Sequence, residues 1–507
     1  MILRLKIIKQ SSDGFIIPAL LVVILIFSTL VIGLSDVISN TLGDATRTQA
    51  RQMSLNVAEA GVNYYLWHMS HNNGDLKDGK TTPASADPVL GYGPYEHTYT
   101  DANGVDRGNF TLYIKPGENG SNVVTVRSIG QSGNIFNTSR TVEAKIGAPS
   151  FSTYAVVGNS QLWFGYSEVA DGPVHSNVGV KMDGPNNSEV TSSNSSYVPS
   201  NSGPGSGSSQ AGVWCDSGVV TPNCNTRSKA SWRYPVPSID FNKISADLCQ
   251  LKKDALNNQA SNACSTRPAR TSSYVPPRTT QFSSNSGYLI ILNTNGTYTL
   301  KSVTNERDTR SDYSSALSTS NIASNIAIPS NGVIFVEDNV WVLSESGGFD
   351  GRVTIASARL ATSGSTTITV ADNLTYKDKY DGHDVIGLIA EQDVDIAPYV
   401  PVPLDVNAAM IAQSGRVQFR PEFNYGGGAT DGYINPNQKL NFFGSVASNE
   451  QWTWSWIRCG SNSTSCWSGF KYNETKYDEN LRYAPPPSFP LTSTYDILEW
   501  REIILGP

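Results

Sequence analysis

The residues most able to do chemistry in this sequence are three carboxylates in the segment DKYDGHD, namely Asp378, Asp381 and Asp384. Carboxylate oxygens are ligands that calcium prefers, although this spacing is not that of an EF-hand loop. With Arg352 or Arg416 as a basic partner, the cluster would also suit an enzyme that cleaves polysaccharides. A solvated acidic loop is the simpler interpretation, and we favour it over both.

Nothing else in the sequence predicts catalysis. There is no GxSxG, phosphate-binding-loop or HExxH pattern, and the chain has only five histidines. A formal charge of −7 and a pI of about 5.4 argue against a nucleic-acid partner, because no basic surface would neutralise phosphates. We therefore expect no enzymatic activity and no cofactor, with calcium as the single ion to consider.

Four tryptophans form a sharper pattern near the C-terminus. Trp452, Trp454 and Trp456 alternate, so in a strand they would project to one face, and Trp467 follows within the next segment. This arrangement predicts a hairpin. Its aromatic stripe would either pack against the rest of the domain or form an adhesive surface that stacks on sugars or a receptor. We favour the packed alternative.

The six cysteines fall into three local pairs, all beyond the N-terminal apolar segment. Outside the cytoplasm such pairs are expected to form disulfides. Zinc binding is the competing interpretation, but no pair has CxxC spacing or a neighbouring histidine. The candidate pairs are Cys215 with Cys224, Cys249 with Cys264, and Cys459 with Cys466.

A long helix must begin near the N-terminus. Residues 1–14 contain three basic side chains, and the apolar run from Phe15 to Leu34 is long enough to cross roughly 30 Å of bilayer core. The basic flank predicts that residues after about 35 lie outside the cytoplasm. Apolar residues then continue at helical spacing to about Met69, which a cleaved signal peptide would not require.

This N-terminus resembles that of a type IV prepilin, since a short basic leader ends in Gly14 and is followed by Phe15 and an apolar helix. The AEAG sequence at 58–61 is similar to a segment in minor pilins of the pilus-assembly family. The resemblance implies cleavage after Gly14 by a prepilin peptidase and N-methylation of Phe15. It also implies that the helix is a membrane anchor first and a contact with other pilin subunits after assembly by the pilus machinery.

The sequence departs from this family pattern at Ala19. Major pilins place a glutamate at the fifth position after the cleavage site, where it is understood to pair with the N-terminal ammonium of a neighbouring subunit. An unpaired carboxylate would be unfavourable in an apolar filament core, so a subunit with no neighbour ahead of it does better without one. Ala19 therefore favours a low-copy or tip subunit.

Beyond the helix, the pattern becomes that of strands. Alternating segments at 110–114, 123–128 and 141–146 predict an antiparallel sheet. Between 333 and 419 a short unit of strand, polar corner and strand recurs at 333–342, 387–396 and 410–419, with a looser copy at 368–376. Units this small share a core only when they are stacked, which favours a short β-solenoid over a sandwich.

The predicted fold is thus mainly β with a long N-terminal α-helix: a pilin-like helix plus antiparallel sheet, then a β-solenoid-like domain. The segments are a leader at 1–14, a helix at 15–70, the sheet at 71–147, Ser/Asn/Gly-rich loops with one helix at 148–287, and the β-solenoid-like exported domain with its C-terminal cap at 288–507.

The predicted function is that of a minor pilin-like subunit, structural and adhesive, that displays a β-rich domain at the cell surface. Its partners would be other pilin subunits and possible host-cell or glycan surfaces. Two alternatives stay open: a membrane-tethered carbohydrate-active β-helix enzyme and a pseudopilin of a type II-like secretion system.

Overall fold

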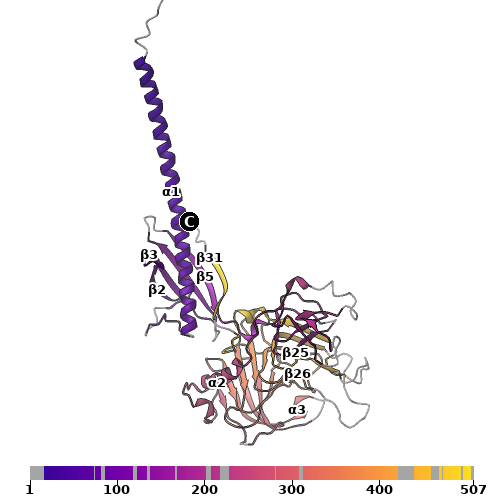
Figure 1. The fold of residues 1–507 in the computed structure, drawn as a ribbon. Coiled ribbons are helices and arrows are strands. Elements are labelled where there is room, and N and C mark those ends of the chain that lie inside the picture. The colour runs from indigo at the N-terminus through magenta and orange to yellow at the C-terminus, as the bar shows by residue number, and fades with distance from the viewer. Residues whose placement is uncertain are drawn as a thin grey trace, which may run out of the picture.

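A computed structural model gives the fold as one long helix followed by a large β-rich region, which confirms the predicted fold class. Helix α1 projects as a rod from the rest of the chain (Figure 1). The structure describes residues 16–72, 75–80, 86–117, 123–133, 138–165, 168–200, 207–216, 228–279, 281–307, 312–420, 439–457, 467–470, 472–492 and 495–503.

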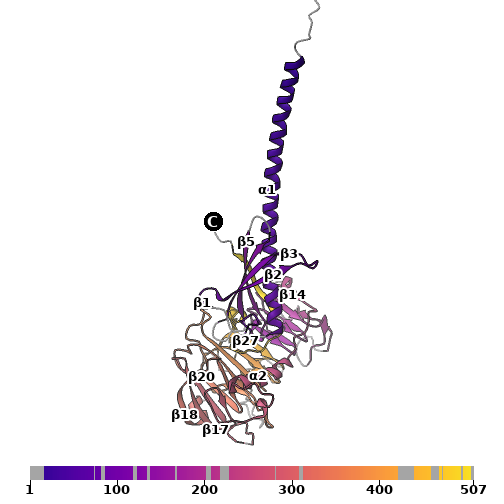
Figure 2. The same ribbon diagram turned by 90° about the vertical axis from the view of Figure 1, so that its left-hand side faces the viewer.

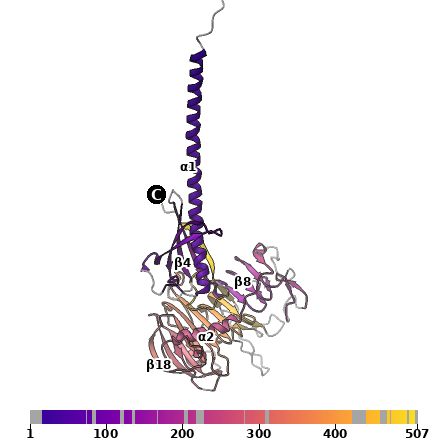
Figure 3. The same cartoon turned by 60° about the vertical axis from the view of Figure 1, so that its left-hand side comes forward.

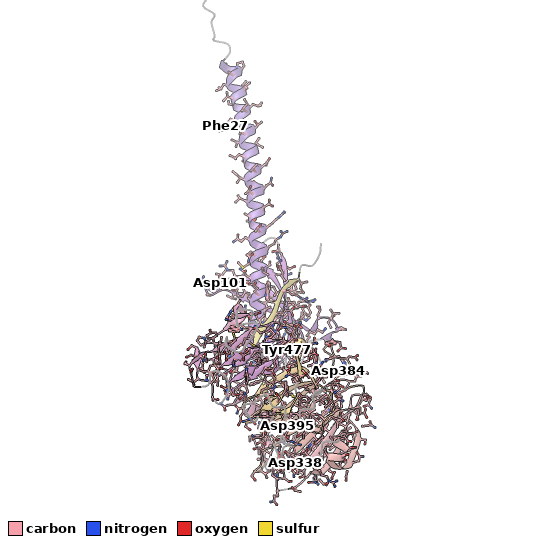
Figure 4. All side chains as sticks on the ribbon, turned by 90° about the vertical axis from the view of Figure 1, so that its right-hand side faces the viewer. Phe27, Asp101, Asp338, Asp384, Asp395 and Tyr477 are labelled. Carbon is pink, nitrogen blue, oxygen red and sulfur yellow. A yellow bond between two sulfur atoms is a disulfide. The ribbon has the colours of Figure 1, made fainter. Side chains whose placement is uncertain are left out.

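Helix α1 (Ile16–His71) has two halves with opposite surroundings. Its N-terminal half is apolar and exposed, as Phe27 illustrates with 68% of its surface accessible (Figure 4). Its C-terminal half buries one side, including Val57, Val62 and Tyr65, against a sheet. Within the described residues, α1 is the one helix that is long and apolar enough to cross a membrane.

The sheet packed on α1 is antiparallel. We call this sheet, together with the second half of α1, the head. Its strand order is β1-β2-β3-β4-β5-β31. Alternate residues such as Tyr95, Leu112 and Val126 face the helix and are buried. The strands are β1 (Ala86–Asp87), β2 (Gly91–Thr100), β3 (Asp106–Lys115), β4 (Val124–Ser132), β5 (Ser139–Gly147) and β31 (Asp496–Ile503).

The AEAG segment marks the point where α1 crosses this sheet most closely. Ala58 and Gly61 are buried, and a Cβ atom added to Gly61 would lie 2.3 Å from Ser128 Oγ on β4. On the sheet side, a Cβ on Gly130 would lie 2.3 Å from the Ala58 backbone nitrogen. Small residues are therefore required on both surfaces, because any larger side chain would push the helix off the sheet.

The sixth strand of the head corrects the predicted domain boundaries. Strand β31 lies in the range 288–507 that the sequence assigned to the solenoid, yet it pairs antiparallel with β5, with Asp496 opposite Gly147. Arg501 forms an ion pair with Glu143 across these strands. The chain thus leaves the head at Gly147 and returns to it at Asp496. Strand β5 lies beside α1 in both views (Figure 1 and Figure 2).

Between these two points the chain builds a distal domain, residues 148–495, which is a β-solenoid. Successive rungs place one strand in a first parallel sheet and the next in a second sheet, as in β19 to β20 and β23 to β24. The repeats at 333–342, 387–396 and 410–419 each supply such a pair. The looser copy at 368–376 does not, because Ile368–Val370 is already the second strand of its rung.

The strands of the first sheet, in spatial order, are β14 (Trp232–Arg233), β10 (Val190–Ser192), β8 (Val174–Ser176), β6 (Val156–Gly158), β27 (Lys439–Ser448), β25 (Leu404–Ala412), β23 (Val385–Ala390), β21 (Arg352–Ser357), β19 (Val333–Val336) and β15 (Tyr274–Val275), and β30 (Tyr472–Tyr477) also pairs with β27. The second sheet contains β18 (Leu317–Ala327), β17 (Thr297–Glu306), β16 (Gly287–Leu292), β20 (Asn339–Ser344), β22 (Ile368–Val370), β24 (Val394–Ile396) and β26 (Val417–Phe419). A third sheet contains β13 (Val213–Trp214), β9 (Val180–Met182) and β7 (Leu162–Phe164). The short pairs are β11 (Ser196–Tyr197) with β12 (Gln210–Ala211) and β28 (Ser455–Ile457) with β29 (Trp467–Gly469).

The region 148–287 therefore contains solenoid rungs and not only loops with one helix, which is a second correction. Its strands span two or three residues each and are rich in Ser and Asn at their corners, so they leave little periodicity to detect. The chain enters the solenoid at β6, in the middle of the first sheet. The last long strand of the solenoid, β27, pairs parallel with β6, so the first and last rungs are neighbours.

A row of asparagines at one corner continues across this closure. Asn177 Nδ2 donates to Asn159 Oδ1 at 2.7 Å, and Asn159 Nδ2 donates to Asn449 Oδ1 at 2.8 Å. Asn449 comes from the end of the chain's last rung, whereas Asn159 and Asn177 come from its first two rungs. The amide row therefore joins rungs that are distant in sequence, and it satisfies polar groups at a tight corner.

Helix α2 (Lys243–Leu256) packs on the outer face of the first sheet at β15 and β19 (Figure 3), and residues such as Phe151 and Phe489 pack on this face as well. Its apolar face, formed by Ile244, Leu248, Leu251 and Ala255, is buried there against residues such as Phe335. The opposite side of the same strands points into the solenoid core. Because both faces are covered, these strands read as continuous apolar runs, as is usual for parallel sheets.

Candidate functional site

The largest apolar surface in the described part of the chain is the N-terminal half of α1. Leu20, Phe27 and Leu34 are each more than half exposed, and the most apolar stretch of the helix has none of its surface buried within the protein. An apolar surface of this size requires a membrane or another protein as its environment. Ala19 lies on this surface. The predicted cleavage and methylation positions, Gly14 and Phe15, lie outside the described residues.

Two of the four predicted aromatics lie in the distal domain's core. Trp454 is 2% exposed, and its ring lies 5.3 Å from Phe442 and 5.6 Å from Trp452. Trp456 is half-buried, and its indole nitrogen donates to the Phe419 carbonyl at 2.9 Å. Trp452 and Trp454 are thus not available to an external ligand, which matches the packed alternative.

A hairpin is present as β28 paired antiparallel with β29, with Ile457 opposite Trp467. It contains Trp456 and Trp467, but Trp452 and Trp454 precede β28, so the three alternating tryptophans do not share one strand. Among the cysteines, Cys249 of α2 forms a disulfide with Cys264, with 5.4 Å between their Cα atoms. Cys215 is also disulfide-bonded. The other three predicted half-cystines, Cys224, Cys459 and Cys466, lie outside the described residues.

The acidic segment DKYDGHD folds as a loop whose carboxylates bind backbone. Asp384 is 1% exposed and accepts from the backbone N–H groups of Gly351 and Asp378, each at 2.7 Å. Asp381 accepts from the N–H of His383 at 2.8 Å. Two of the three carboxylates, those of Asp381 and Asp384, thus accept backbone N–H groups within the loop. Asp378 and Asp381 are exposed, as the favoured solvated loop predicts, whereas Asp384 is buried.

One group near this loop has ligand atoms close enough together for a metal ion: Asp350, His383 and Asp384, all within 4.8 Å of one another. His383 also pairs with Asp384 at 3.0 Å, which raises the pKa of the imidazole. An imidazole ligand suits zinc better than calcium. Because Asp384 already serves two backbone N–H groups, the group is explained by the loop's own structure.

The two basic residues considered for catalysis also have structural roles. Arg352 is buried and donates to the carbonyl groups of Ala484 and Pro485, at 2.7 and 2.6 Å. Arg416 forms an ion pair with Glu450, and its guanidinium lies 5.3 Å from the Trp456 ring centre. Arg352 also donates to the Gly382 carbonyl of the acidic loop at 3.0 Å, so it contacts the backbone of this loop, whereas Arg416 pairs with Glu450.

A buried ion pair that the sequence analysis did not predict joins α2 to the first sheet. Lys252 and Glu337 are 0% and 1% exposed in their side chains, and Lys252 Nζ lies 2.5 Å from Glu337 Oε1. Glu337 Oε2 accepts from the Tyr274 hydroxyl at 2.8 Å. A lysine in an amphipathic helix normally indicates the solvent face, so only the three-dimensional structure identifies this pair.

A second buried polar group lies on the outer face of the second sheet. Asp395 is buried, and Gln418 Nε2 donates to its carboxylate at 3.0 Å (Figure 4). Burial, together with the negative charge of Asp393, raises the pKa of Asp395 to about 7. Nearby, the Glu306 carboxylate accepts a hydrogen bond from Arg420. Burial raises the pKa of Glu306, but this hydrogen bond and the charge of Arg420 lower it by more, so the pKa lies below its ordinary value.

The raised pKa of Asp395 gives a pH-dependent stability. As the pH rises from about 4 to 7, the unfolded chain releases this proton while the folded chain retains it, so the free energy of unfolding falls. Asp395→Asn should remove this loss, making the variant more stable than the wild type by roughly 2–4 kcal/mol above pH 7 and similar to it near pH 4. Denaturant unfolding of the detergent-solubilised full chain at pH 4–8 measures the difference. A difference that stays constant over this range would contradict the assignment.

Comparison with solved structures finds a similarity to the crystal structure of the competence-associated pilin ComZ from Thermus thermophilus. The match covers 90% of this chain and 97% of that chain, with 14% sequence identity and a TM-score of 0.28. No protein-family model matches this chain. No curated protein matches it in sequence.

Proposed function

We propose that this chain is a minor-pilin-like subunit of a type IV pilus, present in few copies or at the tip, that displays its distal domain outside the cell. The observation that supports this most directly is the division of α1 into an exposed apolar half and a half that packs on the head sheet. In such a subunit the first half sits in the membrane and later contacts other pilin subunits.

The same proposal assigns the protein a structural and adhesive role and no catalytic one. The candidate catalytic groups of the sequence are engaged with backbone or with other side chains, as described for Asp384 and Arg416. The prepilin peptidase and the assembly machinery are the expected partners. The absence of a glutamate at position 19 supports low-copy incorporation, because the subunit needs no ammonium partner ahead of it.

The test is the mass and N-terminal sequence of the chain in surface filaments sheared from cells. We expect a mature chain that begins at methylated Phe15, at far lower abundance than the main fibre subunit. Gly14→Glu should leave the full-length chain in the membrane. A mature N-terminus near residues 35–45, or an abundance equal to that of the main subunit, would contradict the proposal. Recovery of the processed chain only from the cell envelope would favour a secretion pseudopilus instead.

A further inference from the structure

The distal domain contains a cavity of about 630 Å³ where five separate segments of the chain meet, one of them β27 through Phe443. One wall comes from the turns before β8 and β10, including Asp171 and Asn187. A second comes from the acidic loop, through Tyr380. The floor comes from β30 and the short helix Glu479–Arg482 that follows it, through Tyr477 (Figure 4). This volume falls within the range of cavities that bind small organic ligands.

Tyr380 is the unusual residue at this cavity. Its ring is 71% exposed, although it is a large aromatic side chain on a well-fixed loop. The ring makes an edge-to-face contact with Phe443, at 5.5 Å and 76°, and Lys379 Nζ lies 5.8 Å from the centre of the Tyr380 ring. The loop itself is held by the buried Asp384 and by an ion pair of 2.6 Å between Lys377 and Asp350. The acidic segment therefore presents one aromatic face in a fixed position.

The polar groups of the cavity are mixed in kind and nearly balanced in charge. Asn187 donates to the Asp171 carboxylate and accepts from the N–H of Gly172 at 2.9 Å, which fixes both side chains. Lys476 and Arg482 provide two cations, and Asp478 and Glu479 provide two further carboxylates beside Asp171. Donors and acceptors thus surround the space without the excess of positive charge that a phosphate or nucleic acid would need.

The floor adds apolar surface that is similarly fixed. Tyr477 directs its hydroxyl away from the cavity, donating to the carbonyl groups of Ser152 and Thr153 at 3.0 Å each, so its ring is among the groups that line the space. Tyr483 lies on the far rim, with Lys145 Nζ 4.6 Å from the centre of its ring. The cavity therefore combines aromatic rings with polar and charged side chains.

We propose that this cavity binds a neutral glycan, with Tyr380 stacked on the apolar face of one sugar ring and Asp171, Asn187 and Glu479 bonded to its hydroxyl groups. A sugar presents C–H groups on its faces and hydroxyl groups around its rim, which is the combination that this cavity complements. The inference rests on the proposed adhesive function and names the ligand class and its site.

The experiment uses the full-length protein in detergent micelles on an array of neutral and sialylated glycans, followed by titration with the best-bound neutral oligosaccharide. We expect binding to neutral glycans. Tyr380→Ala should weaken it by about tenfold or more, as expected for loss of an aromatic contact, while leaving the melting temperature unchanged because the ring is exposed. Tyr472→Ala is the matched control, since Tyr472 is 52% exposed on β30 and does not line the cavity.

Three outcomes would overturn the site: no binding of any neutral glycan, equal binding by Tyr380→Ala, or a preference for sialylated glycans. A second variant, Asn187→Ala, tests the opposite wall and should also weaken binding. Failure here is distinguishable from failure of the pilus proposal. A chain that binds no glycan yet is recovered from filaments removes only the site, whereas a glycan-binding chain absent from filaments removes only the pilus role.

Discussion

Replacing Lys252 with Met should destabilise the distal domain by about 3–5 kcal/mol, because it leaves the carboxylate of Glu337 buried without its main counter-charge. The ammonium group also donates to the carbonyls of Cys264 and Thr266, at 2.9 and 2.7 Å, and these acceptors would lose a partner as well. Denaturant unfolding of the full chain in detergent, followed by near-ultraviolet circular dichroism, measures the loss.

Two further variants make this result specific. Lys253→Met changes the adjacent lysine, which is only half-buried, and should alter the unfolding midpoint little. The double variant Lys252→Met with Glu337→Leu should recover part of the loss, because the unpaired carboxylate is then removed as well, and Arg267, which lies 3.6 Å from Glu337 Oε2, is 26% exposed and reaches solvent. If Lys252→Met behaved like Lys253→Met, the pair would not be buried as the structure has it.

Replacing Trp454 with Ala should also destabilise the distal domain by about 3–5 kcal/mol, since it removes a large ring from a packed cluster. The cavity left between Trp452 and Phe442 would not be refilled by the surrounding strands. The indole N–H bond to Thr475 Oγ1, at 3.3 Å, would be lost too. The same unfolding assay reports the effect.

The control for Trp454 is Trp67→Ala on α1, where the ring is 56% exposed and its loss should have a small effect. An unchanged unfolding midpoint in Trp454→Ala, accompanied by lost binding to cells or glycans, would mean that the tryptophan hairpin is an adhesive surface after all. Glycan binding through Tyr380 should instead persist in this variant wherever the domain is folded.

The sequence predicted those elements whose signals are local. Helix α1 has apolar residues at helical spacing over a long stretch. The segments at 110–114 and 141–146 alternate between apolar and polar residues, and each lies within an observed strand. The repeat of strand, corner and strand identified the solenoid, because stacked rungs repeat the same local pattern.

What the sequence did not predict are pairings between distant segments. Strand β31 returns to β5 across more than three hundred residues, and β27 closes against β6, yet neither pairing has a local signature. The same holds for the candidate glycan site, where Asp171, Tyr380 and Asn480 come from three distant segments. Only Tyr380, the aromatic residue of DKYDGHD, is a local signal for this site, and the neighbouring carboxylates predicted calcium binding instead.

The double connection between head and distal domain has a mechanical consequence. A force applied to the distal domain would enter the head through β5 and β31 together, at their adjacent ends Gly147 and Asp496. Since both strands are pulled in the same direction, the ladder between them is not loaded. The tension passes instead to the ladder that joins β5 to β4, whose eight residue pairs from Val124–Ile146 to Gln131–Ser139 would have to slide together. Such shear resists pulling better than the breaking of one hydrogen bond at a time, so the returning strand makes the connection between the distal domain and the head resistant to tension.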